Sequence, residues 1–370
     1  MDTIDPMVVP DPVTGAPPSM VPPGPPEHPV WFRFWWLLPV VVGLLTLSVS
    51  LNTTLPYYAI APGDAREVDE LIRAPEGRLY PSRGEVYLAT VSLQRVKALG
   101  ALRGWLDSEV DVVPEEQILG RTPPDQYRQQ NLQLMDDSKE TAIVVALRQL
   151  GLNVPETGKG ALIVEIAESS PASGRLEPGD AITGVDGVPT LVSQAAVDRI
   201  RAHRPGERAR VEITDAKGTT RIEEVTLGER DGNAFLGVVM RTKDRRFDMP
   251  FEVNIESGRI GGPSAGLAFT LGLIEQLSAG ELTGGKKVAV TGTIDMNGVV
   301  GEVGGVAQKT AAVRAQGAEV FLVPPGEFKV AKAHAGSKLE VIQVATLDEA
   351  IQALGRIGGD ITAATAGGNR

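Results

Sequence analysis

The chain of 370 residues contains no cysteine and only three histidines. Without cysteine it needs no disulfide bonds, and cysteine usage gives no indication of its redox compartment. The histidines, His28, His203 and His334, are isolated and no His-Glu-x-x-His pattern occurs, so we expect no metal site and no cofactor. The 47 acidic and 36 basic side chains give a net charge of −11, which argues against nucleic acid as a partner.

A run of small residues surrounds Ser264 in the segment Gly262-Pro263-Ser264-Ala265-Gly266, which opens the apolar stretch Leu267 to Leu277. Small residues allow a sharp turn that leaves a serine hydroxyl uncovered at the start of a helix. The free N–H groups of that helix end can stabilise an oxyanion. The segment therefore predicts a nucleophilic serine, whereas the alternative is a tight turn that only begins a helix.

A serine nucleophile needs a base, and Lys309 is a better candidate than any histidine. It lies one turn into a predicted helix from Val306 to Gln316, among small and apolar neighbours. Burial and the positive end of the helix dipole both disfavour the ammonium form, so the pKa of such a lysine falls towards neutrality. Gly317 is expected to end this helix, and Val320 to Val323 to form a buried strand.

Three segments together, Gly262 to Gly266, Thr291 to Ile294 and Gly301 to Lys309, resemble the proteolytic domain of Lon-type proteases over roughly residues 236–354. This resemblance implies Ser264 as nucleophile, Lys309 as general base, and Thr291 and Ala265 as supporting residues, with Thr291 near the dyad. ATP-dependent Lon enzymes usually carry an acidic residue three positions before the serine, where this chain has Gly261.

Upstream, strand, turn and strand signals between Gly160 and Val188 precede a predicted helix near Ser193 to Ala202. This order resembles a bacterial-type PDZ domain. Such domains bind peptides by strand addition, and the resemblance places the carboxylate-binding loop at Gly160, Ala161, Leu162 and Ile163. The alternative is that the domain is a rigid spacer.

No charged residue interrupts the stretch from Phe34 to Leu51, which is near the short end of the roughly 17–25 residues that span a bilayer. Trp31, Trp35 and Trp36 at one end and Tyr57 and Tyr58 at the other resemble interfacial aromatic belts. A cleaved signal peptide is the alternative, but Pro62 follows the small-residue site at Ala59 to Ala61. We therefore expect an uncleaved single-pass anchor, although Arg33 and Arg66 barely discriminate its orientation.

Anchor, PDZ domain and Lon-type domain in this order resemble the membrane-anchored, ATP-independent PDZ-Lon proteases of bacteria over about residues 57–356. The resemblance implies location at the cell membrane, catalytic domains outside the cytoplasm, protein or peptide substrates, the lipid bilayer as a partner, and a hexameric homo-oligomer. It implies an α+β fold, with the catalytic domain of the ribosomal protein S5 domain 2-like class. The expected parts are a disordered cytoplasmic tail (1–30), a transmembrane anchor (31–56), a membrane-proximal α/β segment (57–152), a PDZ domain (153–230), a Lon-type domain (231–356) and a flexible C-terminal tail (357–370).

Three other interpretations concern ATP, kinases and scaffolds. Gly280 to Lys287 nearly matches a phosphate-binding loop, but Lys287 replaces the Mg²⁺-binding Ser or Thr and a strand follows instead of a helix. Some small-molecule kinases share the fold, but Pro263 removes an amide that a phosphate would need. A non-catalytic scaffold that binds peptide C-termini through the PDZ domain remains the main alternative.

Within residues 62–152, Val86 to Leu93 is expected to form a strand and Val96 to Leu106 a helix. The sequence Asp137-Ser-Lys-Glu140 is predicted to cap a helix that runs to Leu150. The polar residues near Arg121 to Gln133 are interpreted as a solvated helix face. This segment is interpreted as joining the anchor to the PDZ domain, and as a candidate to complete the catalytic sheet.

Overall fold

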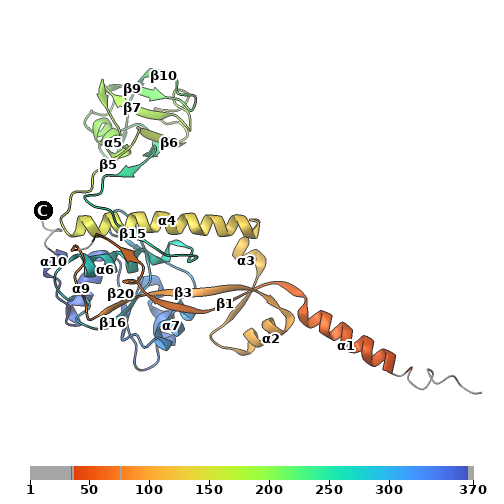
Figure 1. Ribbon diagram of the computed structural model, residues 1–370. Helices are drawn as coiled ribbons and strands as arrows, with labels where there is room; N and C mark the ends of the chain where they lie inside the picture. Colours follow the sequence, from red (N-terminus) through yellow and green to blue (C-terminus); the bar gives the residue numbers. More distant parts are fainter. Residues whose placement is uncertain (1–34, 36, 76, 366–370) are drawn as a thin grey trace, which may run out of the picture. The chain divides into compact units, whose positions relative to one another are not determined.

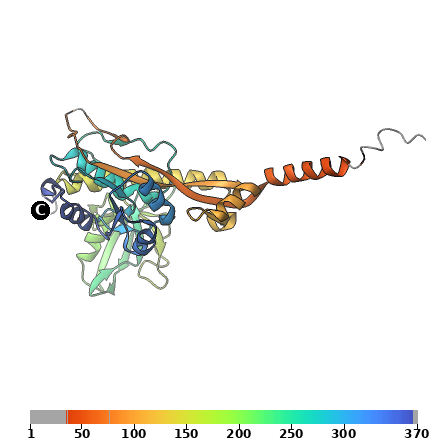
Figure 2. The same ribbon diagram turned by 90° about the horizontal axis from the view of Figure 1, so that it is seen from below.

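A computed structural model describes residues 35, 37–75 and 77–365 (Figures 1 and 2). The chain divides into two compact units, Met1–Thr53 and Thr54–Arg370. The predicted N-terminal tail, most of residues 31–36 and the last five residues lie outside the described part.

The described helix of the first unit is α1 (Leu37–Asn52), whose 16 residues include no charged side chain. No helix in the described part of the chain combines the length and the apolarity needed to cross a bilayer.

The second unit is built on a mixed six-stranded sheet that draws strands from distant parts of the sequence (Figure 1). Strands β20, β19, β16 and β3 are parallel, and β1 pairs antiparallel with both β3 and β4. Figure 2 shows β1 and β3 as long strands that run side by side. In chain order the strands are β1 (Thr54–Glu67), β3 (Glu85–Lys97), β4 (Asp111–Pro114), β16 (Lys287–Val290), β19 (Val320–Val323) and β20 (Glu340–Gln343).

Side chains alternate across this sheet, so each face buries its own apolar core. On β3, Val86 and Leu88 join a core with helices α4 (Pro124–Gln149), α6 (Gly266–Leu277) and α9 (Leu347–Arg356). Tyr87 and Ala89 of the same strand join the opposite core, with α7 (Val306–Ala315) and α8 (Phe328–His334). The segment before residue 152 therefore contributes strands and a core helix to the same sheet as the C-terminal part.

Helix α4 begins at Pro124 and runs without a break to Gln149, so it joins the helix predicted from Asp137 to the solvated helix face predicted near Arg121 to Gln133. Its N-terminal half is polar and has no apolar period, but Asn131 there accepts a backbone hydrogen bond from Gly262 (2.8 Å). This long-range contact is invisible in local sequence. The predicted helix from Val306 and the strand at Val320–Val323 are confirmed as α7 and β19.

An antiparallel sheet in the order β10-β9-β7-β6-β13 has an apolar core of its own, separate from the two cores described above. The last strand, β13, lies beyond the predicted boundary at residue 230, and it pairs with β6 along the whole of its length. The elements are β6 (Ala161–Ile166), β7 (Ala181–Val185), β8 (Val188–Pro189), α5 (Ser193–Arg201), β9 (Arg208–Thr214), β10 (Thr220–Thr226), β11 (Gly228–Arg230), β12 (Asn233–Phe235) and β13 (Val238–Thr242).

This β-rich domain is inserted into the larger α/β domain. The chain enters it after β5 (Glu156–Thr157) and leaves through β14 (Arg246–Phe247), and these two strands pair with each other. Hydrogen bonds between Lys159 and Lys243 and between Lys243 and Gly160 continue the pairing to the domain itself. The entry and exit segments thus form one two-stranded connection, which follows α4 in the chain and precedes the segment that contains Ser264.

The remaining described elements are short or peripheral. They are β2 (Ile72–Arg73), α2 (Ala98–Leu106), α3 (Glu115–Leu119), β15 (Asn254–Ile255), the 3₁₀ turn η2 (Pro263–Ala265), β17 (Thr293–Ile294), β18 (Val300–Gly301), the 3₁₀ turn η3 (Pro325–Glu327) and α10 (Thr362–Thr365).

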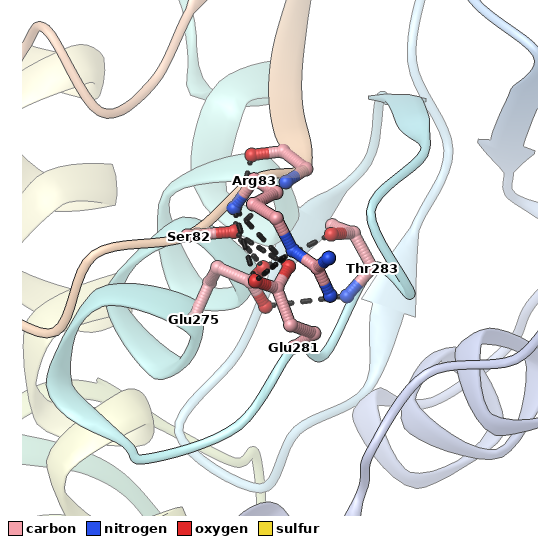
Figure 3. Close-up of polar contacts among 6 residues, drawn as sticks. Ser82, Arg83, Glu275, Glu281 and Thr283 are labelled. Carbon is pink, nitrogen blue, oxygen red and sulfur yellow. Dashed lines mark hydrogen bonds and ion pairs between the residues drawn. The ribbon is translucent and has the colours of Figure 1, made fainter.

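A buried carboxylate fixes the C-terminal end of α6 (Figure 3). Glu275, which is 1% exposed, accepts hydrogen bonds from the Ser82 hydroxyl and from the Thr283 hydroxyl (2.9 Å) and backbone N–H (3.2 Å). The neighbouring Glu281 accepts from the backbone and side chain of Arg83 at the surface. Figure 3 shows both carboxylates facing the loop that carries Ser82. These two carboxylates therefore connect the loop that carries Ser82 and Arg83, and the loop that carries Thr283, to the end of α6.

We predict that Glu275→Ala lowers the free energy of unfolding by about 2–4 kcal/mol, because three buried donors lose their charged acceptor. Urea unfolding followed by circular dichroism measures this loss. The matched control is Glu281→Ala, which removes a mostly exposed ion pair and is expected to cost less than about 1 kcal/mol. Equal costs for the two substitutions would contradict the assigned role of Glu275.

Candidate active site

Ser264 lies in η2, directly before the buried helix α6. Gly262 precedes it with φ of 90°, a backbone conformation that favours glycine. The segment is held from both sides: Gly292 donates its N–H to Ser264 O (3.0 Å), and Gly262 donates to Asn131 O (2.8 Å). Strand β16 ends at Val290 and β17 begins at Thr293. Between them, Thr291 donates its N–H to Leu322 O and so continues the sheet contact, whereas Gly292 turns to the serine segment.

Lys309 lies in the first turn of α7 and is 3% exposed. Burial lowers the pKa of Lys309 from its usual value of 10.5 to about 8, and the Glu327 carboxylate partly opposes this shift. The helix approaches the sheet closely because Gly305, with φ of 68°, has no Cβ; one placed there would lie 2.8 Å from Val91 Cγ1. The expected burial of this lysine is therefore present in the fold.

Thr291 connects the lysine to the serine segment. Lys309 Nζ donates to Thr291 Oγ1 (3.1 Å), and the same hydroxyl lies 3.5 Å from Ser264 O. Thr291 is fully buried, so its hydroxyl has little freedom to find other partners. Within the described part of the chain, no hydrogen bond joins Lys309 Nζ directly to Ser264 Oγ. The structure thus brings Ser264, Thr291 and Lys309 together, with the lysine turned to the threonine.

A cavity of about 970 Å³ opens onto this cluster and is lined by Ser264, Ala265 and Lys309. Its wall includes residues of β1, β3, α3 and α4, of the loops before η2 and α7, and of β17. Arg66, Arg128, Arg259, Asp64, Asp125 and Glu302 are its charged lining residues. The cavity is large enough for several residues of an extended peptide.

Ser138 was missed from the sequence, although it contacts the serine segment directly. Its buried hydroxyl on α4 donates to Pro263 O (3.1 Å), the carbonyl of the peptide unit that leads into Ser264. The only sequence signal was its position in the predicted helix cap, which indicated a local role. Ser138 thus holds the peptide unit that leads into Ser264.

We predict that Ser138→Ala lowers kcat about tenfold with little change in KM, because the Pro263–Ser264 peptide unit loses one of the contacts that orient it. Initial rates on a fluorogenic peptide, with circular dichroism as a check on folding, measure this effect. Asp137→Ala, at the exposed neighbouring position, is the matched control and should leave kcat unchanged. A stability loss in Ser138→Ala with unchanged kcat would show a purely structural role.

We also predict that Lys309→Met stabilises the folded chain at pH 7. The pKa of Lys309 is lower in the folded state than in the unfolded state, so the unfolded chain binds the proton more tightly and stability rises with pH between about 8 and 10.5. Removing the amine should add up to about 3 kcal/mol to the free energy of unfolding at pH 7, and almost nothing above pH 10.5. The exposed Lys332→Met is the control. If Lys309→Met were less stable than the unchanged protein at pH 7, burial of the Lys309 amine would not destabilise the fold, and the prediction would be wrong.

The structure contradicts the predicted carboxylate loop at Gly160, Ala161, Leu162 and Ile163. The last three residues lie in β6, which pairs with β7 on one side and β13 on the other. The backbone N–H groups of Gly160 and Ile163 already donate to Leu191 O and Asp180 O. The edge strand beside α5 is β13, where Ser193 donates its N–H to Thr242 Oγ1 (3.0 Å).

Comparison with known proteins gives two family matches. The PDZ domain family matches residues 148–223, and the Lon protease (S16) C-terminal proteolytic domain matches residues 246–355. The chain carries a PDZ domain followed by a Lon-type proteolytic domain. The PDZ domain is the inserted β-rich domain, and the Lon match begins where the two-stranded connection returns to the α/β domain.

Among curated relatives, Lon protease 2 of Bacillus subtilis (strain 168) is 32% identical over 116 residues, which are 30% of this chain and 20% of that protein. The chain thus matches about a fifth of the length of that relative. The PDZ domain of an SdrC-like protein from Listeria innocua is 24% identical and covers 22% of this chain and 92% of its own, with a TM-score of 0.21. A solution structure from Geobacillus thermodenitrificans is 29% identical and covers 22% and 97%, with a TM-score of 0.20.

Proposed function

We propose that this protein is an ATP-independent serine endopeptidase that uses a dyad of Ser264 and Lys309. The observation that carries the proposal is the opening of one cavity onto both residues, with the pKa of Lys309 lowered to about 8 by burial. A lysine with that pKa is partly neutral under physiological conditions and can accept the proton of a serine hydroxyl.

In the proposed reaction, Nζ turns from Thr291 Oγ1 to Ser264 and takes the hydroxyl proton as Oγ attacks the carbonyl carbon of the scissile peptide bond. The carbonyl electron pair moves onto oxygen, where the backbone N–H groups of Ser264 and Ala265 in η2 stabilise it. Collapse breaks the C–N bond, and the proton passes from Lys309 to the leaving amine. Water, deprotonated by Lys309, then attacks the acyl ester and releases the second product with Ser264 restored.

ATP independence is supported by the position in the fold of residues 280–286, which resemble a phosphate-binding loop in sequence alone. Residues 280–286 connect the end of α6 to the start of β16, whereas a phosphate-binding loop connects a strand to a following helix. We therefore expect peptide-bond hydrolysis without added nucleotide.

A fluorophosphonate probe, which labels activated serines, distinguishes the proposed protease from the alternative of a non-catalytic scaffold. The protease predicts covalent labelling at Ser264 and degradation of casein without ATP. The scaffold predicts neither. Labelling that persists in Ser264→Ala would place the nucleophile elsewhere.

We propose that the PDZ domain binds substrate segments by strand addition to β13 and not to β6. This strand is at the edge of the sheet, its Val239 side chain is 56% exposed, and α5 lies beside it to form the second wall. Leu236 and Gly237, which connect β12 to β13, directly precede the strand, as a carboxylate-binding loop should. A role as a rigid spacer is the alternative.

The cysteine-free chain allows a direct test of this groove. Val239→Cys labelled with a bulky maleimide should raise KM for casein, because the label covers the free edge of β13. Ile222→Cys on β10, at the other edge of the same sheet and 51% exposed, is the matched control. Equal KM values for the two labelled proteins would favour the spacer.

We propose further that residues 31–56 anchor the chain in the cell membrane, with the catalytic domains outside the cytoplasm, and that the chain assembles into a hexamer. The uncharged α1 and the resemblance to PDZ-Lon proteases support the anchor. Protease added to cells with a permeable wall should digest the region after Tyr58. A mature chain that begins near Pro62 would instead show that the apolar segment is cleaved, and a monomer in sedimentation of the detergent-solubilised protein would exclude the hexamer.

A further inference from the structure

Helix α2 has an exposed apolar face that the protease mechanism does not use. Leu99, Leu102 and Leu106 lie at helical positions i, i+3 and i+7, and Trp105 extends the same face. Their exposed fractions are 41%, 52%, 81% and 63% in the order Leu99, Leu102, Leu106, Trp105. Four large apolar side chains on nine residues of helix form a patch that water solvates poorly.

The opposite face of α2 is packed against the fold, so the orientation of the exposed face is fixed. Ala101 and Gly104 are buried, and a Cβ at Gly104 would lie 2.6 Å from Val112 Cγ2 on the segment of β4. The helix cannot rotate its leucines inward without losing this close approach.

The strand register places the start of α2 where the chain enters the sheet. Lys97, the N-cap residue of α2, is paired with Thr54, the first residue of β1. Paired residues of antiparallel strands have Cα atoms about 5 Å apart. Thr54 is joined to Asn52, the last residue of the uncharged α1, through a single residue. If residues 31–56 form the anchor, α2 begins next to the point where the chain leaves the bilayer.

We propose that α2 lies on the membrane surface and inserts Leu99, Leu102, Trp105 and Leu106 into the lipid headgroup region. The combination of leucines and a tryptophan on one face with Arg103 at its border is typical of helices that lie in the interface. This inference rests on the proposed anchor and adds a second membrane contact, which holds the base of the β1–β3 ladder at a fixed height above the bilayer.

The test uses Trp105 as the reporter in the full chain. Tryptophan occurs at positions 31, 35, 36 and 105 only, so Trp31→Phe, Trp35→Phe and Trp36→Phe together leave a single fluorophore. This protein is reconstituted in phosphatidylcholine vesicles that contain lipids brominated in the upper part of the acyl chain. We expect Trp105 fluorescence to fall by roughly half relative to vesicles without bromine, because interfacial helices bury their apolar face about 5–10 Å deep.

The matched control moves the tryptophan to an equally exposed apolar position in the PDZ domain, with Trp105→Phe and Leu191→Trp in the same background; Leu191 is 57% exposed. Its fluorescence should be unaffected by bromine. A second variant, Leu102→Gln with Leu106→Gln, should weaken the quenching of Trp105 while casein hydrolysis persists.

Each outcome decides between membrane contact and its alternatives. Chain that floats with vesicles but shows no bromine quenching of Trp105 would overturn this inference alone and leave the anchor and the protease intact. Quenching by neither bromine nor aqueous iodide would assign the face to a protein contact, such as a second copy of the chain, and also overturn it. Chain that does not float would overturn both the anchor and the α2 contact, whereas fluorophosphonate labelling would still report on the protease.

Discussion

Replacing Ser264 with alanine is expected to lower kcat/KM for peptide-bond hydrolysis by about 10⁴-fold or more, because the hydroxyl that forms the acyl ester in the proposed reaction is removed. The substitution removes only a hydroxyl from a half-buried position, so the fold should persist. Hydrolysis of a fluorogenic peptide by purified full-length protein, together with urea unfolding, measures both quantities. Substantial activity in Ser264→Ala would overturn the assignment of the nucleophile.

Lys309 should act with Ser264 as one unit. Lys309→Ala and Lys309→Arg are each expected to be as inactive as Ser264→Ala, and the double substitution no worse than either alone. Arginine keeps its charge near neutral pH and cannot accept the serine proton. Losses that multiply in the double variant would mean that the two residues contribute independently, and the dyad would then be wrong.

The parts of the site that the sequence predicted correctly are those with local signals. Helix α7 begins after a glycine pair and ends before Gly317, and its small neighbours foretold the burial of Lys309. Helix α6 is a continuous apolar run behind a glycine-rich turn. Motif spacing and resemblance then brought Ser264, Thr291 and Lys309 to one place, and the family matches confirm the PDZ and Lon-type domains.

The parts that were missed depend on pairing between distant segments. The contacts of α4 with Pro263 and Gly262, which Ser138 and Asn131 make, appear only in three dimensions. The carboxylate-binding loop was predicted at Gly160 to Ile163 because neither β6 nor β13 indicates by its own sequence that the two strands pair. Strand pairing of this kind is set by the whole sheet and not by the propensity of one segment.

The pH dependence of hydrolysis should follow the protonation of Lys309. Burial lowers its pKa to about 8, and only the neutral amine can act as base, so the reactive fraction grows as pH rises through that value. We expect kcat/KM to increase about tenfold per pH unit below roughly pH 7.5 and to level off above about pH 8.5. A rate series between pH 6 and 10, with stability monitored in parallel, measures the inflection. A rate that falls as pH rises from 6 to 8 would exclude a lysine base.

Glu327 provides the specific control for this profile. Its carboxylate is the charge that raises the pKa of Lys309 against the effect of burial, so Glu327→Gln should move the inflection to lower pH and make the enzyme faster at pH 6 to 7. The same neutralisation in Glu340→Gln, on the exposed start of β20, should leave the inflection in place. If the inflection reported only the net charge of the protein, both variants would shift it equally. If it reports the protonation of Lys309, only Glu327→Gln will shift it. The shift must then be to lower pH, because the charge removed is negative.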